Sequence, residues 1–326
     1  MKKIMPFVVI MVLLVVLFFV SINVGSIDVT FVQLLRGLFV EFDPMVAAIY
    51  DLRFPRIFVA MLAGAAISTS GVLLQAVLKN PLADPGIIGV SSGASFVAVV
   101  VTVFLPRFHG FIPVAALVGA LVAFVLVYAL AWQDGVGPVR LILVGIAIDA
   151  VFTGLASSLI AISGGQMGGV AAIVSGNMTL KTWSDVWGLS IYVVVGLIVS
   201  LFLLRSCNFM ALEDKTVRGI GINIQAHRLA ISLTAVLLAG ISAGFVGTIS
   251  FLGLIVPHMG RVIIGHDHKY LVPFSMLLGA FTLLLADTVG RVIAHPHEVS
   301  ATIIMAVIGG PFFIFLLRRN GKNVAS

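Results

Sequence analysis

The sequence predicts an all-α membrane protein of about ten transmembrane helices, folded as a single polytopic domain over residues 1–326. Hydrophobic residues make up 60% of the chain and charged residues only 10%, whereas a soluble domain has roughly 25% charged residues. A water-soluble globule of this size cannot hide so much apolar surface, so lipid must solvate most of it. Apolar runs near the bilayer-spanning length of about 20 residues also recur from end to end.

The predicted helices follow one another with short connections. They are 6–24, 56–77, 88–105, 111–131, 139–161, 186–205, 228–249, 251–264, 271–294 and 299–317. The first follows Met1-Lys2-Lys3 as in a secretory signal peptide, but its length favours a retained helix. The eighth is too short to span alone, so we expect a sharp turn at Phe251–Gly253. The Gly-rich stretch Ser163–Thr182 is expected to be an outer loop with a short re-entrant or surface helix.

Ten spans from an inside amino terminus place both termini in the cytoplasm, and the distribution of Lys and Arg tests this topology. The inner side then holds Lys2, Lys3, Lys79, Arg140, Arg205, Lys215, Arg218, Arg228, Arg261, Lys269, Arg318, Arg319 and Lys322. The outer side holds Arg36, Arg53, Arg56, Arg107, Lys181 and Arg291. This excess of basic residues on the inner side supports the predicted topology.

Composition also excludes several functions. The net charge of +6 comes from basic residues that lie singly between apolar runs, which argues against nucleic-acid binding. The single cysteine, Cys207, excludes an internal disulfide and a cysteine-based metal or iron–sulfur site. Small residues spaced three or four apart within 64–71 and 240–247 predict flat helix faces for close packing.

Five motifs occur in a fixed order along the chain. They are Arg53-Phe54-Pro55-Arg56, the loop Lys79–Pro85, Gly89–Ala94, the polar stretch Glu213–Asn223, and Ile249–His258. Together they resemble the FecCD family of ABC importer permeases, also called type II importers, over about residues 25–317. The resemblance implies ten helices per subunit in the type II importer permease fold and a bacterial cytoplasmic-membrane location.

The resemblance also implies an assembly. A second permease subunit, identical or related, would complete a dimer around a central path. Two cytoplasmic ABC ATPase subunits and an extracytoplasmic substrate-binding protein, free or lipid-anchored, would be the other partners. The chain itself would be no enzyme and would bind no cofactor or metal, with ATP held by the partner ATPase. In agreement, the sequence contains no GxxxxGK[ST] phosphate loop.

Three outer arginines are candidates for docking the binding protein. Arg53 and Arg56 flank Pro55, which suits a first helical turn. Because a helix amino terminus disfavours cations, a structural role for these two is unexpected and binding of an acidic partner is favoured. The resemblance assigns them, with Arg291, to glutamates of the binding protein; anchoring to lipid headgroups is the alternative.

The resemblance makes Glu213–Asn223 the helix that couples the permease to the ATPase. Glu213 and Asp214 would start this helix, Lys215 and Arg218 would end it, and Gly219 and Gly221 would break it. Acidic residues first and basic residues last also suit the helix dipole, so a solvated surface turn is the alternative.

Other residues are candidates for the path or its gate. They are Asn80, Pro81, Asp84 and Pro85 in a stiff inner loop, and Ser91, Ser92 and Gly93 at the start of the third span. A rigid turn is an equally good explanation for the loop.

Two acidic residues lie within spans, where ionisable groups are costly. Asp149 stands where the family usually has an amide, and we expect it to make an interhelical hydrogen bond. Asp287 lies one turn before Arg291, so we expect an i,i+4 ion pair. The family commonly has Glu-x-Pro-x-Gly before the last helix, and the chain departs from this pattern with Glu298-Val299-Ser300-Ala301.

The outer histidines His109, His295 and His297 raise the possibility of haem ligation, although interfacial polar residues explain them as well. His258, in the family motif, is expected to pack between helices or contact the ATPase. The sequence thus predicts the permease of an ATP-driven importer for an iron chelate, ferric siderophore or haem, with cobalamin as the alternative. An ion-coupled secondary transporter would need mid-membrane ion sites, which the sequence does not suggest.

Overall fold

The computed structural model describes residues 3–24, 29–86, 88–131, 138–163, 178–219, 221–294 and 297–321, and all regular elements in these ranges are helices. They are α1 (Ile4–Asn23), α2 (Phe31–Phe39), α3 (Pro44–Leu52), α4 (Phe54–Leu78), α5 (Val90–Phe104), η1 (Pro106–Phe111), α6 (Ile112–Ala131), α7 (Pro138–Ile162), α9 (Trp183–Phe202), α10 (Leu204–Met210), α11 (Asp214–Gly219), α12 (Ile224–Val246), α13 (Leu252–Ile264), α14 (His268–Val292) and α15 (Ala301–Gly321).

Within these ranges, seven helical stretches are long and apolar enough to cross a membrane, and three shorter apolar helices accompany them: α5, α13 and the start of α15. The prediction of an all-α membrane protein with about ten spans is confirmed. The predicted turn before the eighth span is confirmed too. Phe251 adopts the left-handed conformation (φ 66°), and α13 begins at the next residue.

Local chemistry sets the ends of α4. Pro55 lies in its first turn, where a missing N–H costs nothing. The helix stops at Lys79, which has a left-handed conformation (φ 48°). The Asn80-Pro81 sequence follows at once, and a residue before proline disfavours helix.

Two short helices between the first two predicted spans were not predicted. Thr30 caps α2 by accepting a hydrogen bond from the Gln33 amide, and Asp43 caps α3 by accepting one from the Met45 amide at 2.8 Å. These caps are the sequence signals that could have revealed the two helices. Of the predicted outer loop at 163–182, residues 164–177 lie outside the described part of the chain.

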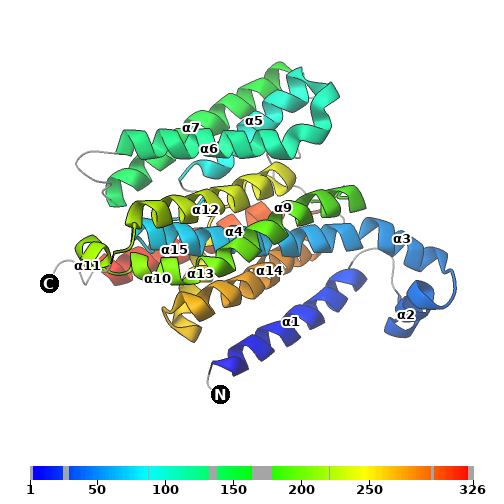
Figure 1. Cartoon of the computed structure of the whole chain (residues 1–326). Helices are drawn as coiled ribbons and strands as arrows, with labels where there is room; N and C mark the ends of the chain where they lie inside the picture. The colour runs from blue at the N-terminus through cyan, green and yellow to red at the C-terminus, as the bar shows by residue number, and fades with distance from the viewer. Residues whose placement is uncertain are drawn as a thin grey trace.

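Helix α4 runs through the middle of the bundle (Figure 1), packing against α14, α12, α9 and α13. In an apolar 18-residue window of the stretch Pro44–Leu78, which comprises α3 and α4, 83% of the residues are buried within this one chain, compared with 22% for α1 and 11% for α7. Figure 1 shows α5, α6 and α7 grouped on one side of the bundle and α1 on the opposite side. The peripheral helices therefore present their apolar surfaces to lipid or to other chains.

Side-chain contacts define two ends of the bundle. At one, Lys79 at the end of α4 reaches Asp214 of α11, and Lys3 lies 4.2 Å from the ring of Tyr270 in α14. We name this the α11 end. At the other, Arg56 at the start of α4 reaches Asp287 near the end of α14, and we name it the arginine end.

The predicted flat faces are the places where α4 and α12 meet their neighbours. A Cβ atom on Gly64 would overlap the carbonyl oxygen of Gly279 in α14, and one on Gly71 would overlap that of Gly253 in α13. A Cβ on Gly244 of α12 would lie 2.7 Å from the Cβ of Ala116 in α6. Glycine is thus required where backbones approach too closely for any side chain.

Substituting Gly71→Ala should lower the thermal midpoint of the purified protein, because the added methyl must push α13 away from α4. Overpacking of this kind costs about 1–3 kcal/mol. Gly154→Ala in α7 is the matched control, since a Cβ there meets no heavy atom within 4 Å. Thermal unfolding in detergent, followed by size-exclusion chromatography, gives the midpoints. Equal midpoints for the two variants would contradict the close-packing assignment.

Candidate functional site

The arginine end holds a network of buried charges. Arg56 Nη2 lies 2.8 Å from Asp287 Oδ1, and Arg56 Nη1 lies 2.8 Å from Glu298 Oε2. Arg291 Nε is 3.4 Å from the other oxygen of Asp287. Arg56 and Arg291 are only 6% and 8% exposed. Within this set two buried guanidinium groups meet the buried carboxylate of Asp287 and the exposed carboxylate of Glu298.

The carboxyl of Glu298 is the more accessible member, with its side chain 39% exposed. Burial raises its pKa, but this is outweighed by the hydrogen bond and charge of Arg56 and by a hydrogen bond from Thr179, so the pKa lies below 4.5. Glu298 therefore stays ionised at neutral pH and holds the segment before α15 against the start of α4.

The structure brings the three predicted docking arginines to one end of the molecule. Arg53 donates to the backbone carbonyl of Ile22 and is half-buried. Arg291 also donates to the carbonyl and hydroxyl of Ser21. The expected i,i+4 pair of Asp287 with Arg291 is confirmed. The expectation that Arg56 has no structural role is wrong, because its ion pairs outweigh the helix dipole; docking itself stays a prediction.

The α11 end centres on Asp214. Its Oδ1 lies 3.1 Å from Lys79 Nζ, and its Oδ2 lies 3.3 Å from Arg228 Nη2. The pKa of Asp214 is lowered, chiefly by the hydrogen bond from Lys79 and further by Arg228. One carboxylate thus joins α11 to the end of α4 and to the first turns of α12. Asp214 is therefore a contact that α11 makes with both helices.

The other predicted coupling residues surround this contact. Glu213 precedes α11 directly, Lys215 is exposed within it, and Gly219 closes it. Gly221 has φ 79°, which breaks the helix as expected. The side chain of Arg218 lies outside the described part of the chain. A helix of the predicted extent is present, and its role as coupling helix stays a prediction.

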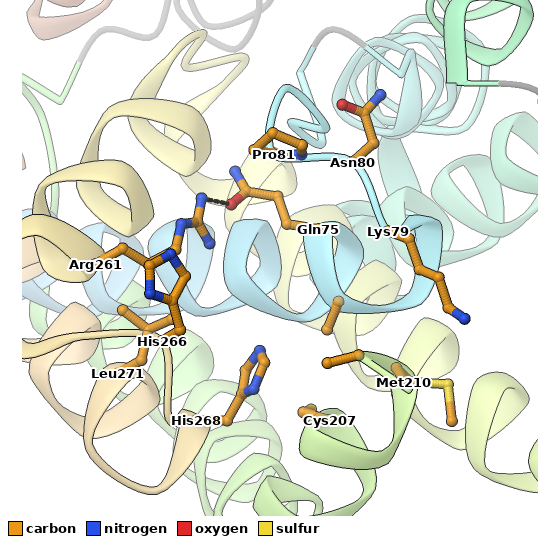
Figure 2. A pocket seen from close by; sticks show the side chains of 12 residues that line it. Gln75, Lys79, Asn80, Pro81, Cys207, Met210, Arg261, His266, His268 and Leu271 are labelled. Atoms are coloured by element: carbon orange, nitrogen blue, oxygen red, sulfur yellow. Dashed lines mark hydrogen bonds between the residues drawn. The ribbon is translucent and has the colours of Figure 1, made fainter. Parts of the chain in front are cut away.

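A cavity of about 370 Å³ opens beside this contact, between α4, α10, α13 and α14. In Figure 2, Gln75 and Arg261 point toward each other across it, and Arg261 Nη2 donates to Gln75 Oε1. Gln75 Nε2 also donates to the carbonyls of Ala83 and Gly253, at 3.0 and 3.1 Å. One amide thus ties the end of α4 to the inner loop and to the first and last turns of α13.

Two further lining residues bear on the chemistry of this cavity. Burial raises the pKa of the Cys207 thiol to about 12, so the thiol stays protonated. His268 Nδ1 lies 2.7 Å from Asn208 Oδ1, which fixes the start of α14 against α10. The cavity therefore holds a protonated thiol beside a hydrogen-bonded contact between α10 and α14.

Of the predicted gate residues in the inner loop, Asn80, Asp84 and Pro85 are buried, whereas Pro81 is exposed. Asn80 Oδ1 accepts from the Leu82 amide, and Asp84 Oδ1 accepts from the Gly86 amide at 2.7 Å. Pro85 lies against Gly253, and Pro81 lines the cavity beside Lys79. These turns support the stiffness expected of the loop.

Ser91, Ser92 and Gly93 are buried in the first turn of α5, and a Cβ on Gly93 would lie 2.7 Å from the carbonyl oxygen of Gly119. A contact between α5 and α6 thus accounts for Gly93, while a role in the path stays a prediction. Asp149 of α7 interacts with Ser92, which is an interhelical contact of the kind expected.

The described histidines form no metal site. No group of three or more His, Cys, Asp or Glu side chains within the described residues could hold a metal ion. The His258 ring packs edge-on against Phe312 at 5.6 Å, as expected of a helix-packing residue. His297 is exposed, whereas His295 and the side chain of His109 lie outside the described part of the chain.

Sequence reasoning missed the roles of Glu298 and Ser21 at the arginine end and of Arg228 at the α11 end. Glu298 could have been found by charge counting, since it is the sole acidic residue after Asp287. Ser21 carries no such signal, because a serine in an apolar helix gives no hint of its partner.

Comparison with known proteins agrees with the order of these features. The model of the FecCD transport family matches residues 13–319. The chain belongs to the FecCD transport family. A relative of this FecCD chain is the probable heme-iron transport system permease protein IsdF of Staphylococcus aureus (strain bovine RF122 / ET3-1). The two are 37% identical over 322 residues, which cover 99% of this chain and 98% of the relative.

Solved structures have the FecCD fold seen here. A metal-chelate type ABC transporter in an inward-facing conformation matches with a TM-score of 0.78 at 28% identity, covering 95% of this chain and 97% of that one. PsaBC from Streptococcus pneumoniae in complex with Fab matches with a TM-score of 0.62 at 15% identity, covering 88% and 95%. The second likeness concerns the fold alone.

Removing the shared carboxylate with Asp287→Asn should destabilise this FecCD protein strongly, because the buried Arg291 then loses its carboxylate partner and the buried Arg56 keeps only the exposed Glu298. Breaking one partner of a buried ion pair costs about 3–5 kcal/mol. Thermal midpoints of Asp287→Asn, Arg56→Gln and the double variant form the test. The double variant should be less destabilised than the sum of the singles, and strict additivity would exclude the pairing.

Because of the ion pair of Glu298, the thermal stability of the protein should depend on pH. Because its folded pKa lies below 4.5, its contribution is present above about pH 4.5 and is lost as pH falls through the folded pKa. The gap in thermal midpoint between wild type and Glu298→Gln should therefore be largest near pH 7 and shrink in acid. Glu41→Gln, which alters an exposed pair with Arg36, is the control. A gap independent of pH would contradict this assignment.

Proposed function

We propose that this chain is the membrane-spanning permease subunit of an ATP-driven ABC importer that takes up an iron chelate, with haem as the favoured cargo. The similarity to a heme-iron permease along nearly the full length of both chains carries the proposal. Ferric siderophore is the second candidate within the same class, and cobalamin is the third.

The division of labour follows from the family and the sequence. The permease makes and breaks no covalent bond, and ATP is bound by two separate cytoplasmic ATPase subunits. The absence of a phosphate-loop motif from the sequence supports this division. A second permease subunit, identical or related, completes the dimer, and the sparsely covered apolar α7 is a surface suited to it.

The proposed orientation places the α11 end in the cytoplasm and the arginine end outside a bacterial cytoplasmic membrane. Both chain termini are then cytoplasmic. The excess of Lys and Arg on the inner side supports this orientation.

Coupling would run through α4. The ATPase moves α11, and Asp214 transmits the displacement to Lys79 and Arg228. Lys79 ends α4, and one turn earlier Gln75 holds the inner loop, α13 and Arg261. Movement of α11 thereby reaches the elements around the cavity in Figure 2, whose space allows them to shift.

Docking would occur at the arginine end. Arg53 is half-buried there, while Arg56 and Arg291 are buried and engaged with carboxylates. A glutamate of the binding protein could pair with Arg53 and replace the more exposed Glu298 at Arg56. Docking would then release the segment before α15 from the start of α4, which links binding outside to movement of a span.

The test is uptake into proteoliposomes that hold the permease with its candidate ATPase and binding protein. Haem or iron-55 siderophore is supplied with the binding protein, and ATP is supplied to the ATPase. We expect ATP-dependent uptake that Arg53→Glu reduces by about tenfold or more, as expected for loss of a charged contact worth about 1.5–3 kcal/mol.

Arg36→Glu, at the exposed Arg36–Glu41 pair on α2, is the matched control and should retain uptake. Lys79→Gln should leave binding-protein association intact and reduce uptake per ATP hydrolysed. Uptake that ignores ATP but collapses with a proton or sodium gradient would replace this proposal with a secondary transporter.

A further inference from the structure

A groove of about 440 Å³ lies between the end of α6 and the start of α12. Phe124, Val125 and Tyr128 form the α6 side, with Phe124 and Tyr128 stacked at 6.0 Å between ring centroids. Arg228 and Leu229 lie on the α12 side. The groove is mostly apolar and contains one charged side chain.

Arg228 brings an excess positive charge to this groove. It shares Asp214 with Lys79, so two cations face one carboxylate. The Asp214 oxygens lie 3.3 and 3.4 Å from Arg228 Nη2, longer than a strong charge-assisted hydrogen bond of about 2.7–2.9 Å. None of the described residues that line the groove is acidic. The local charge therefore favours an additional anion.

The guanidinium of Arg228 also has unused hydrogen-bonding capacity. It carries five N–H donors. Its hydrogen bonds within the described residues all use Nη2, and Nε is buried with no partner. A buried donor without an acceptor costs free energy, so an acceptor with several oxygens would satisfy the site.

The rest of the groove suits an acyl chain. Val125 is 60% exposed and Leu229 is 59% exposed, so apolar side chains of both helices lie open on either side. The exposed Val122 on α6 and Leu233 on α12 continue this surface along the spans. A soluble anion would leave these apolar walls uncovered, whereas a lipid would cover them with the same hydrocarbon that surrounds the helices.

We propose that this groove binds an anionic phospholipid, with its phosphate on Arg228 and an acyl chain along Phe124, Val125 and Leu229. Basic pockets between helices at a membrane surface recognise anionic headgroups in this way. The bound phosphate supplies the second negative charge that balances Arg228 and Lys79, because Asp214 supplies only one. Because the same guanidinium reaches α11, the lipid sets the charge balance of the segment that connects α4 with α12. The site is independent of the cargo proposed above.

Native mass spectrometry of the full permease tests the proposal. The protein is incubated with equal amounts of phosphatidylglycerol and phosphatidylcholine that carry the same acyl chains. Wild type should retain the anionic lipid preferentially. Arg228→Gln should reduce this preference by about tenfold, as expected for loss of a hydrogen bond to a charged group. Arg228→Lys, which keeps the charge, should retain part of it.

Two further variants separate lipid binding from general attraction. Ala129→Phe fills the groove from its exposed side while leaving Arg228 in place, and it should also reduce retention. Arg205→Gln removes an exposed positive charge at the start of α10 that does not line the groove, and it should leave the preference unchanged. Thermal unfolding of each variant confirms that it is folded.

Three outcomes would overturn the proposal. An equal loss with Arg205→Gln would show that surface charge alone attracts the lipid. Full retention in Ala129→Phe would show that no acyl chain lies in the groove. Displacement of phosphatidylglycerol by millimolar inorganic phosphate would show that the site takes free phosphate. Because these measurements involve neither ATP nor cargo, their failure would leave the proposed transport function untouched.

Discussion

The rest of the structure depends on the close approach of backbones around α4. This helix packs against four others at once, and Gly64 and Gly71 let the backbones of α14 and α13 come into direct contact with it. In a membrane the association of helices relies on packing and hydrogen bonds, since lipid is as apolar as the helix surface. Close packing at small residues therefore stabilises the position of α4, as burial of a hydrophobic core stabilises a soluble protein. They also hold the two ends of the helix in fixed positions relative to their neighbours.

Each end of α4 carries a different electrostatic arrangement, and the difference follows from burial. At the arginine end, Arg56 and Asp287 are almost fully enclosed, so the charges must balance and the contacts are short. At the α11 end, Asp214 and Lys79 are more than one-third exposed. Water screens that cluster, and it tolerates two cations on one carboxylate. The arginine end is thus tightly paired and the α11 end loosely paired, a difference that supports the proposed docking at the first and coupling at the second.

Much of the architecture could be predicted because a membrane restricts the choices so strongly. Apolar runs located the spans within a few residues, and Phe251–Gly253 located the turn before α13. The short helices α2 and α3 were not predicted, because nine residues are too few for a helical pattern of apolar residues to be recognised. Asp287 and Arg291 were paired correctly, because helical periodicity fixes the distance between residues four apart. The structural role of Arg56 was not predicted, because only the dipole of its own helix was considered and not the carboxylates of other helices.

The sequence by itself determined that this protein lives in a membrane, how its spans are ordered, and that it belongs among the FecCD permeases. Composition, the length of apolar runs and the order of motifs are properties of the sequence alone. They can be determined without knowing which residues contact one another in the fold. The tertiary structure alone decided which distant residues meet. Arg56 and Asp287 are 231 positions apart, and Gln75 and Arg261 are 186 apart. Such pairs depend on which helices cross and where. A crossing is set by helix faces of small residues, and the sequence of such a face does not show which other helix it contacts.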